Sequence, residues 1–137
     1  MNPLNLSRRE DRETGLALLY EADMTGDDMS DVLDRNHADE DDYGTSIAAG
    51  VAANLDSLDL LIDRIAEDWS VSRMAGIDRS ILRMGAWELV HRAEVPTTAV
   101  VSEAVALANQ YSTEKSAPFI NGILVKLAAN ERDEATI

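Results

Sequence analysis

Cysteine is absent from the 137-residue sequence, and this absence excludes three kinds of chemistry at once. Disulfide frameworks, thiolate metal sites and cysteine nucleophiles all require the missing side chain. Histidine is nearly as scarce, because only His37 and His91 are present. Each lacks a second histidine at the spacing of a metal site, so we expect both to be solvated surface residues.

Motifs of catalysis and cofactor binding are also missing, since no glycine-rich phosphate loop and no nucleophile elbow occurs. Residues 39–44 begin like a calcium loop, but Tyr43 and Gly50 stand where that loop needs a ligand and a bidentate glutamate. We therefore expect no enzyme activity, no cofactor and no metal site. The acidic loop should instead favour the positive N-terminus of a helix that begins near Tyr43.

Long apolar runs do not occur either. No stretch approaches the ~18 to 20 apolar residues of a membrane span, and the N-terminus lacks a basic segment followed by an apolar one. We expect a cytoplasmic protein with no membrane segment. Aromatic residues make up only 4%, so the core has to be aliphatic, with Trp69, Trp87 and Phe119 as its large exceptions.

Basic residues are outnumbered, because 12 Lys and Arg oppose 26 Asp and Glu and give a net charge of −14. Residues 21–42 contain ten acidic side chains against Arg35 alone. Such an excess opposes nonspecific binding to nucleic acid and to anionic membranes. The acidic stretch is most simply a solubilising segment.

Helical periodicity accounts for most of the chain, and no segment shows sustained period-two alternation. Helices are predicted from a capping box at Ser7 to a stop at Gly26, over about 30–36, over 43–69 with a break or kink at Asn54, over 77–89, over about 97–111, and from Pro118 onward. We expect one all-α domain over residues 1–137, a bundle of about six or seven helices. An arginine-bearing helix at about 7–25 and an acidic segment at about 26–44 precede a helical core at about 45–130.

The segment 77–89 is predicted to be the central helix, because its apolar residues cover more than one face. Ser70 or Ser72 is expected to cap it. The small residues at 48–53 permit close packing, which we expect inside the domain in preference to a dimer interface.

Three arginines near the N-terminus, Arg8, Arg9 and Arg12, fall within an arc of about 100° on a helix. Leu16 and Leu19 lie in the same arc, so the arginines continue the core-facing stripe. Arginine cannot enter an aliphatic core unpaired, so this end of the helix is expected to project past the bundle and offer its guanidinium groups to phosphate. The alternative is a solvated helix start, because acidic neighbours neutralise the segment.

Ordered blocks of sequence resemble the NusB family of bacterial antitermination factors. The matching residues are Trp69, Arg73-Met74, Ile77-Asp78-Arg79-Ser80-Ile81-Leu82-Arg83, Trp87-Glu88-Leu89, Val95-Pro96, Val101 to Ala108, Tyr111-Ser112 and Phe119 to Leu124, together with the N-terminal helix from Arg8 to Tyr20. The resemblance covers nearly the whole chain apart from the acidic middle.

This resemblance implies an all-helical fold of two small subdomains and a role in transcription antitermination. The expected partners are boxA-type single-stranded RNA of ribosomal RNA leader transcripts, the ribosomal protein NusE and the transcription elongation complex. It places RNA contacts at Arg8, Arg9, Arg12, Arg79, Lys115 and Phe119. Tyr20 and Asp78 fall at positions of the partner surface, and Asp78 and Arg79 are expected at the exposed start of the central helix.

The sequence departs from the family pattern at several positions. Glu10 and Asp11 stand where basic or neutral residues are usual, and Pro118 and Asn109 replace frequent lysines. Each basic residue that is missing from the RNA surface lowers the salt dependence of RNA binding, because one phosphate fewer is neutralised. We therefore expect a weak RNA binder that becomes effective with NusE.

Two other functions and one question of assembly stay open at this stage. The chain could be a protein-binding helical module that has lost most RNA binding, as its negative charge suggests. It could also be an RNA-targeting domain that acts with a separate ribosomal RNA methyltransferase, because no cofactor-binding domain is recognisable in it. A monomer and a homodimer that covers the arginine end are both compatible with the sequence.

Overall fold

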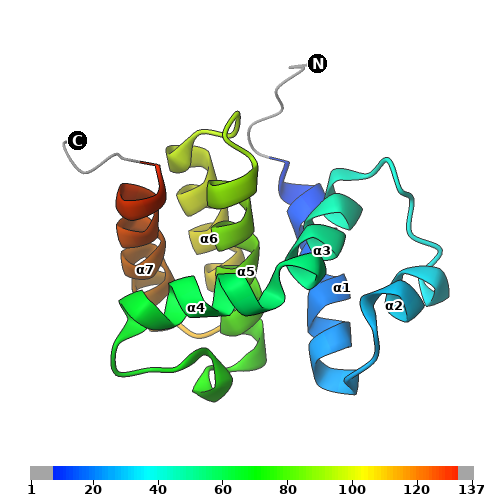
Figure 1. The fold of residues 1–137 in the computed structure, drawn as a ribbon, viewed down its shortest axis with the longest axis horizontal. Helices are drawn as coiled ribbons and strands as arrows, with labels where there is room; N and C mark the ends of the chain where they lie inside the picture. The colour runs from blue at the N-terminus through cyan, green and yellow to red at the C-terminus, as the bar shows by residue number, and fades with distance from the viewer. Residues whose placement is uncertain (1–7, 133–137) are drawn as a thin grey trace.

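The computed structural model describes residues 8–132, which form seven α-helices and one short 3-10 helix without any β-strand. In chain order these are α1 (Arg9–Thr25), α2 (Met29–Arg35), α3 (Tyr43–Ala53), α4 (Leu55–Ala66), the 3-10 helix η1 (Val71–Arg73), α5 (Gly76–His91), α6 (Thr97–Tyr111) and α7 (Ser116–Glu131). Figure 1 shows α1 to α3 gathered on one side and α4 to α7 on the other. The predicted all-α bundle is confirmed.

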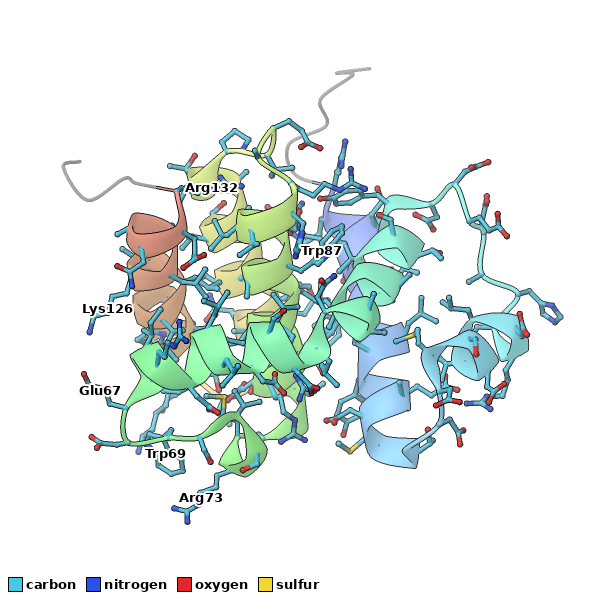
Figure 2. The ribbon with its side chains drawn as sticks, viewed as in Figure 1. Glu67, Trp69, Arg73, Trp87, Lys126 and Arg132 are labelled. Carbon is cyan, nitrogen blue, oxygen red and sulfur yellow. The ribbon has the colours of Figure 1, made fainter. Side chains whose placement is uncertain are left out.

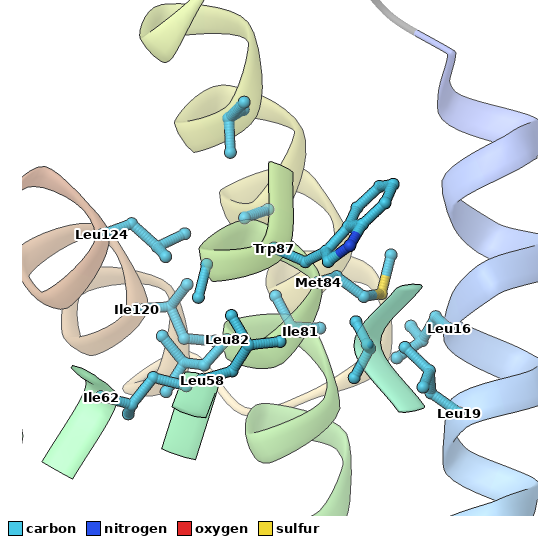
Figure 3. Packing of buried hydrophobic residues seen from close by; sticks show 14 of the residues in the cluster. Leu16, Leu19, Leu58, Ile62, Ile81, Leu82, Met84, Trp87, Ile120 and Leu124 are labelled. Carbon is cyan, nitrogen blue, oxygen red and sulfur yellow. The ribbon is translucent and has the colours of Figure 1, made fainter. Parts of the chain in front are cut away.

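The central helix is α5, as its wide apolar face predicted. It packs against α1, α3, α4, α6 and α7. Ile81 and Leu82 are completely buried, and Figure 3 shows them between the leucines of α1 and the side chains of α4 and α7. Gly85 lies against Leu124 of α7, where an added Cβ would come within 2.7 Å of a leucine methyl group. Burial of this kind contributes ~1.5 to 3 kcal/mol per large aliphatic side chain.

The predicted break at Asn54 is a sharp bend, because α3 and α4 meet there at 81°. Within residues 8–132 no single helix is long and apolar enough to cross a membrane, and only this bent pair satisfies length and composition together. The bend turns Ile47 and Val51 toward α1 and α5, while Leu58 and Ile62 of α4 are buried in the same core.

One face of the small-residue run in α3 serves internal packing, as expected, whereas Ala49, Ala52 and Ala53 are exposed. A Cβ on Gly50 would overlap the ring of Trp87, which is 6% exposed. Ala48 and Val51 are completely buried. The buried face of α3 is therefore not available to a partner, and the homodimer stays a hypothesis.

Helix ends agree with the predictions in part. Gly26 ends α1 with φ 76°, and the side chain of Asp42 accepts a hydrogen bond from the Gly44 amide at the start of α3. The capping role given to Ser70 or Ser72 is wrong, because η1 intervenes and Ala75 precedes α5. The capping box involves Ser7, which lies outside the described residues.

Candidate functional site

The three N-terminal arginines have three different environments, although they lie within a single turn. The guanidinium carbon of Arg8 is 3.9 Å from the ring centre of Tyr43, a cation–π contact. The side chain of Arg9 is 48% exposed and donates two hydrogen bonds to Glu103, at 2.7 and 3.0 Å. Arg12 is only 2% exposed. The predicted single patch is therefore not present.

Arg12 lies inside the molecule, and the expectation that it projects past the bundle is wrong. Its Nε and Nη2 atoms donate to the two carboxylate oxygens of Glu88, at 2.9 and 2.8 Å. The Tyr43 hydroxyl donates to the same carboxylate at 2.6 Å. Burial, together with the negative charge and hydrogen bond of Glu88, raises the pKa of Tyr43 far above its ordinary range. Glu88 lies 76 residues from Arg12, so the local sequence of the first helix held no sign of it.

Arg9 belongs to a polar seam between α1 and α6. Its bond to Glu103 raises the pKa of the guanidinium group, so it stays charged at every physiological pH. Farther along the seam, the Tyr111 hydroxyl donates to Glu13 at 2.6 Å. Tyr111 is the last residue of α6 and is 45% exposed.

The start of the central helix is less exposed than the resemblance implied. Asp78 accepts hydrogen bonds from the hydroxyls of Ser112 and Ser116, at 2.6 and 2.8 Å. The Arg79 side chain is 13% exposed and donates to Asp23 at 2.6 Å and to the Met74 carbonyl at 2.9 Å. Asp78 therefore fixes the loop between α6 and α7, and Arg79 joins α5 to α1. Neither stands free at the surface.

A surface hollow of about 320 Å³ brings several predicted residues together. Asp78, Lys115 and Phe119 line it, and so do Trp69 and Arg73. A second hollow of about 290 Å³ shares Trp69 and Phe119 as walls. Figure 2 shows Trp69 and Arg73 at the edge of the molecule formed by the chain between α4 and α5.

Trp69 and Arg73 also line this hollow, although neither was predicted to be a site residue. Trp69 was placed in the core because it continues the apolar stripe of 43–69. However, α4 ends at Ala66, where Glu67 adopts a positive φ of 35°, and Trp69 is 55% exposed. A stop at Glu67 has no glycine or proline to mark it, so the sequence offered no signal.

Tyr20 lies on α1 beside the start of α5, together with Met24. A Cβ on Gly76 would come within 3.0 Å of the Tyr20 ring and 2.7 Å of the Met24 methyl group. The two side chains are 37% and 51% exposed. They form a small apolar patch of one aromatic ring and one methionine, two side-chain types that are enriched at protein interfaces.

Histidines and carboxylates make no metal centre in the described part of the chain. Within residues 8–132 no three His, Cys, Asp or Glu side chains come together as metal ligands. His37 and His91 are both exposed, which confirms the prediction of surface histidines.

Comparisons with known proteins agree on one family. The model of the NusB family matches residues 9–129. The transcription antitermination protein NusB of Clavibacter michiganensis subsp. michiganensis is 37% identical over 134 residues, which span 91% of this chain and 98% of the relative. A solved structure of NusB from T. maritima has a TM-score of 0.83 and 28% identity, and the match covers 95% of this chain and 97% of that one. A chain from a structure of antitermination factors NusB and NusE with dsRNA has a TM-score of 0.78 at 22% identity, covering 93% and 99%, and shares the fold.

Proposed function

Because the chain belongs to the NusB family, we propose that it is a non-enzymatic, cytoplasmic transcription antitermination factor. It binds boxA-type RNA of ribosomal RNA leader transcripts together with NusE, within the transcription elongation complex, and helps RNA polymerase resist termination. The observation that carries this proposal is the match to antitermination proteins over nine-tenths of the chain, since a relative of 37% identity covers 91% of it.

A continuous surface supports the RNA part of the proposal. The exposed Arg9 marks one end of the α1–α6 seam, and the pair Glu13–Tyr111 continues it toward the end of α6. The following loop reaches the hollow that Lys115 and Phe119 line. Guanidinium and ammonium groups neutralise phosphates, and an aromatic ring stacks on bases. Single-stranded RNA is bound by these two kinds of contact, and residues for both lie along this path.

The geometry divides the candidate residues into two groups. We assign direct RNA contacts to Arg8, Arg9, Lys115 and Phe119, whose side chains reach the surface at least in part. We assign positioning roles to Arg12 and Arg79, because their side chains are 2% and 13% exposed, against 48% for Arg9. Asp78 has the same role, because two serine hydroxyls engage its carboxylate. Arg12 orients α1 against α5, and Asp78 holds the loop that bears Lys115.

NusE is expected to contact the apolar patch of Tyr20 and Met24. A net charge of −14 repels RNA at a distance, so the chain alone should bind RNA weakly. A partner that buries Tyr20 and adds its own RNA contacts would overcome this repulsion.

Binding of a labelled boxA-type oligonucleotide, measured by fluorescence anisotropy with and without NusE at moderate salt, tests the proposal. We expect NusE to tighten binding, and Arg9→Ala and Lys115→Ala each to weaken it. Arg64→Ala is the matched control, because Arg64 is an exposed arginine on α4, away from the seam. Equal binding with and without NusE, combined with no effect of the first two variants, would contradict the proposal.

A further inference from the structure

Trp69 and Phe119 each line both of the surface hollows described above. Trp69 is 55% exposed, whereas the other tryptophan, Trp87, is 6% exposed and packs inside. Figure 2 shows the Trp69 side chain pointing outward from the chain between α4 and η1. Part of a large, flat ring is therefore available to a ligand.

The charges around the two hollows differ in sign. Arg73 and Lys115 line the first hollow, and its carboxylate, Asp78, is already engaged by two serine hydroxyls. Lys126 faces two carboxylates in the second hollow, Glu67 and Asp68. A phosphate is therefore attracted to the first hollow and repelled by the second.

We infer that Trp69 and Arg73 extend the RNA-binding surface one nucleotide beyond Phe119 and end it there. In this arrangement a base stacks on the exposed indole face of Trp69, and Arg73 binds the adjoining phosphate. The inference rests on the proposed function and names two residues that it does not require.

Single-stranded RNA suits this hollow better than a protein segment does. Sites for single strands combine a cationic groove with aromatic rings on which bases stack. The hollow has two cations and two aromatic rings within a molecule whose overall charge is −14. A protein segment that buried Arg73 and Lys115 would have to supply matching carboxylates, whereas RNA brings a phosphate at each nucleotide.

Tryptophan fluorescence provides a direct test, because the chain has only two tryptophans. The complex with NusE is titrated with boxA-type RNA, and the same titration is repeated with Trp69→Phe. We expect RNA to quench the wild-type emission and to leave the emission of Trp69→Phe nearly unchanged. Phenylalanine still stacks, so the anisotropy of labelled RNA should give similar affinities for the two proteins.

Substitutions then separate stacking from charge. Trp69→Ala should weaken RNA binding about 5- to 150-fold. Arg73→Gln should reduce the slope of log affinity against log salt concentration by about 0.7. Lys126→Gln, at the rim of the second hollow, should leave that slope unchanged. Thermal unfolding of each variant verifies that the fold is intact.

Three results would overturn the inference. If the anisotropy shows RNA binding but Trp69→Ala and Arg73→Gln behave like Lys126→Gln, RNA does not reach this hollow and the proposed function stands. If NusE alone quenches Trp69 and RNA adds nothing, the hollow belongs to the protein interface. If the wild-type complex binds no RNA, the proposed function fails and the inference fails with it.

Discussion

Arg12 and Glu88 form a buried ion pair that joins the first helix to the central one. Both side chains are 2% exposed, and two parallel hydrogen bonds of 2.9 and 2.8 Å connect them. The Tyr43 hydroxyl completes the group from α3. The carboxylate of Glu88 therefore connects α1, α3 and α5. It fixes their relative positions, because the donors from α1 and α3 compensate a negative charge that water cannot reach.

Arg12→Ala should lower the free energy of unfolding by about 3 to 5 kcal/mol, because Glu88 would be left as an uncompensated buried charge. Arg9→Ala is the matched control. Its ion pair is partly exposed, so its loss should cost about 1 kcal/mol or less. Urea unfolding followed by circular dichroism measures both. Equal midpoints for Arg12→Ala and the wild type would show that the pair does not stabilise the fold.

Tyr43→Phe should cost about 1.5 to 3 kcal/mol, because it removes one hydrogen bond to the charged Glu88 and leaves the ring in place. The contact of Arg8 with the ring is kept. Urea unfolding should therefore reveal a loss of stability, while the circular dichroism spectrum of the native protein stays unchanged. An unaltered midpoint would mean that the hydroxyl contributes nothing at this site.

Gly50→Ala should destabilise the protein by about 1 to 3 kcal/mol, because the new methyl group overlaps the buried ring of Trp87. Gly122→Ala is the opposite case. Nothing lies within 4 Å of a Cβ at Gly122, so alanine should stabilise α7 by about 0.5 to 1 kcal/mol. Thermal unfolding of the two variants compares them directly. A stabilised Gly50→Ala protein would show that α3 can move away from Trp87 without cost.

Features that depend on local sequence pattern could be predicted from the sequence. The predictions were wrong where the position of a side chain depends on a residue far away in the chain. The helices, the break at Asn54 and the stop at Gly26 each follow from periodicity or from the conformation of one residue. The burial of Arg12 depends on Glu88, and the position of Asp78 depends on Ser112 and Ser116. Such pairs become visible only when helices far apart in the chain are packed together. Trp69 was misplaced for a different reason. The periodicity of 43–69 placed it in the core, but α4 ends at Ala66 and no glycine or proline marks that end.

Asp11→Asn should stabilise the protein at neutral pH. Burial raises the pKa of Asp11, and the hydrogen bond and negative charge of Asp42 raise it further. The folded state therefore holds the Asp11 proton more tightly than the unfolded state does. The bound proton therefore contributes favourably to the free energy of unfolding. This contribution is complete at pH values below the ordinary pKa of 3.8, and it is lost as the pH rises through the raised pKa.

The gain from Asp11→Asn should accordingly be largest at pH 7 and disappear as the solution is acidified toward that ordinary pKa. Thermal midpoints measured from acidic to neutral pH give the difference from the wild type. Asp34→Asn, at an exposed position of the acidic stretch, is the control for the general effect of removing one negative charge. A difference that is the same at every pH, or equal for both variants, would contradict the role of Asp42.

Asp78→Lys should unfold more easily than the wild type and should also bind RNA less tightly. The resemblance alone suggested a surface contact whose change leaves stability unaltered. The structure instead gives Asp78 two hydrogen bonds to Ser112 and Ser116, and bonds to a charged group contribute about 1.5 to 3 kcal/mol each.

Asp78→Asn separates the two roles of this residue. Its amide keeps one oxygen to accept from Ser112 and gains an NH₂ group that can donate to Ser116, so it preserves the loop while removing the charge. Thermal unfolding should place Asp78→Asn close to the wild type and Asp78→Lys well below it. Hydrogen exchange should show faster exchange near Lys115 in the lysine variant only, because that loop is no longer anchored.

If Asp78→Asn keeps the midpoint and the RNA affinity but binds NusE less tightly, the carboxylate itself contacts the partner and the loop is secondary. If both variants keep the wild-type midpoint, the serine hydrogen bonds do not hold the loop and Asp78 belongs to the surface after all.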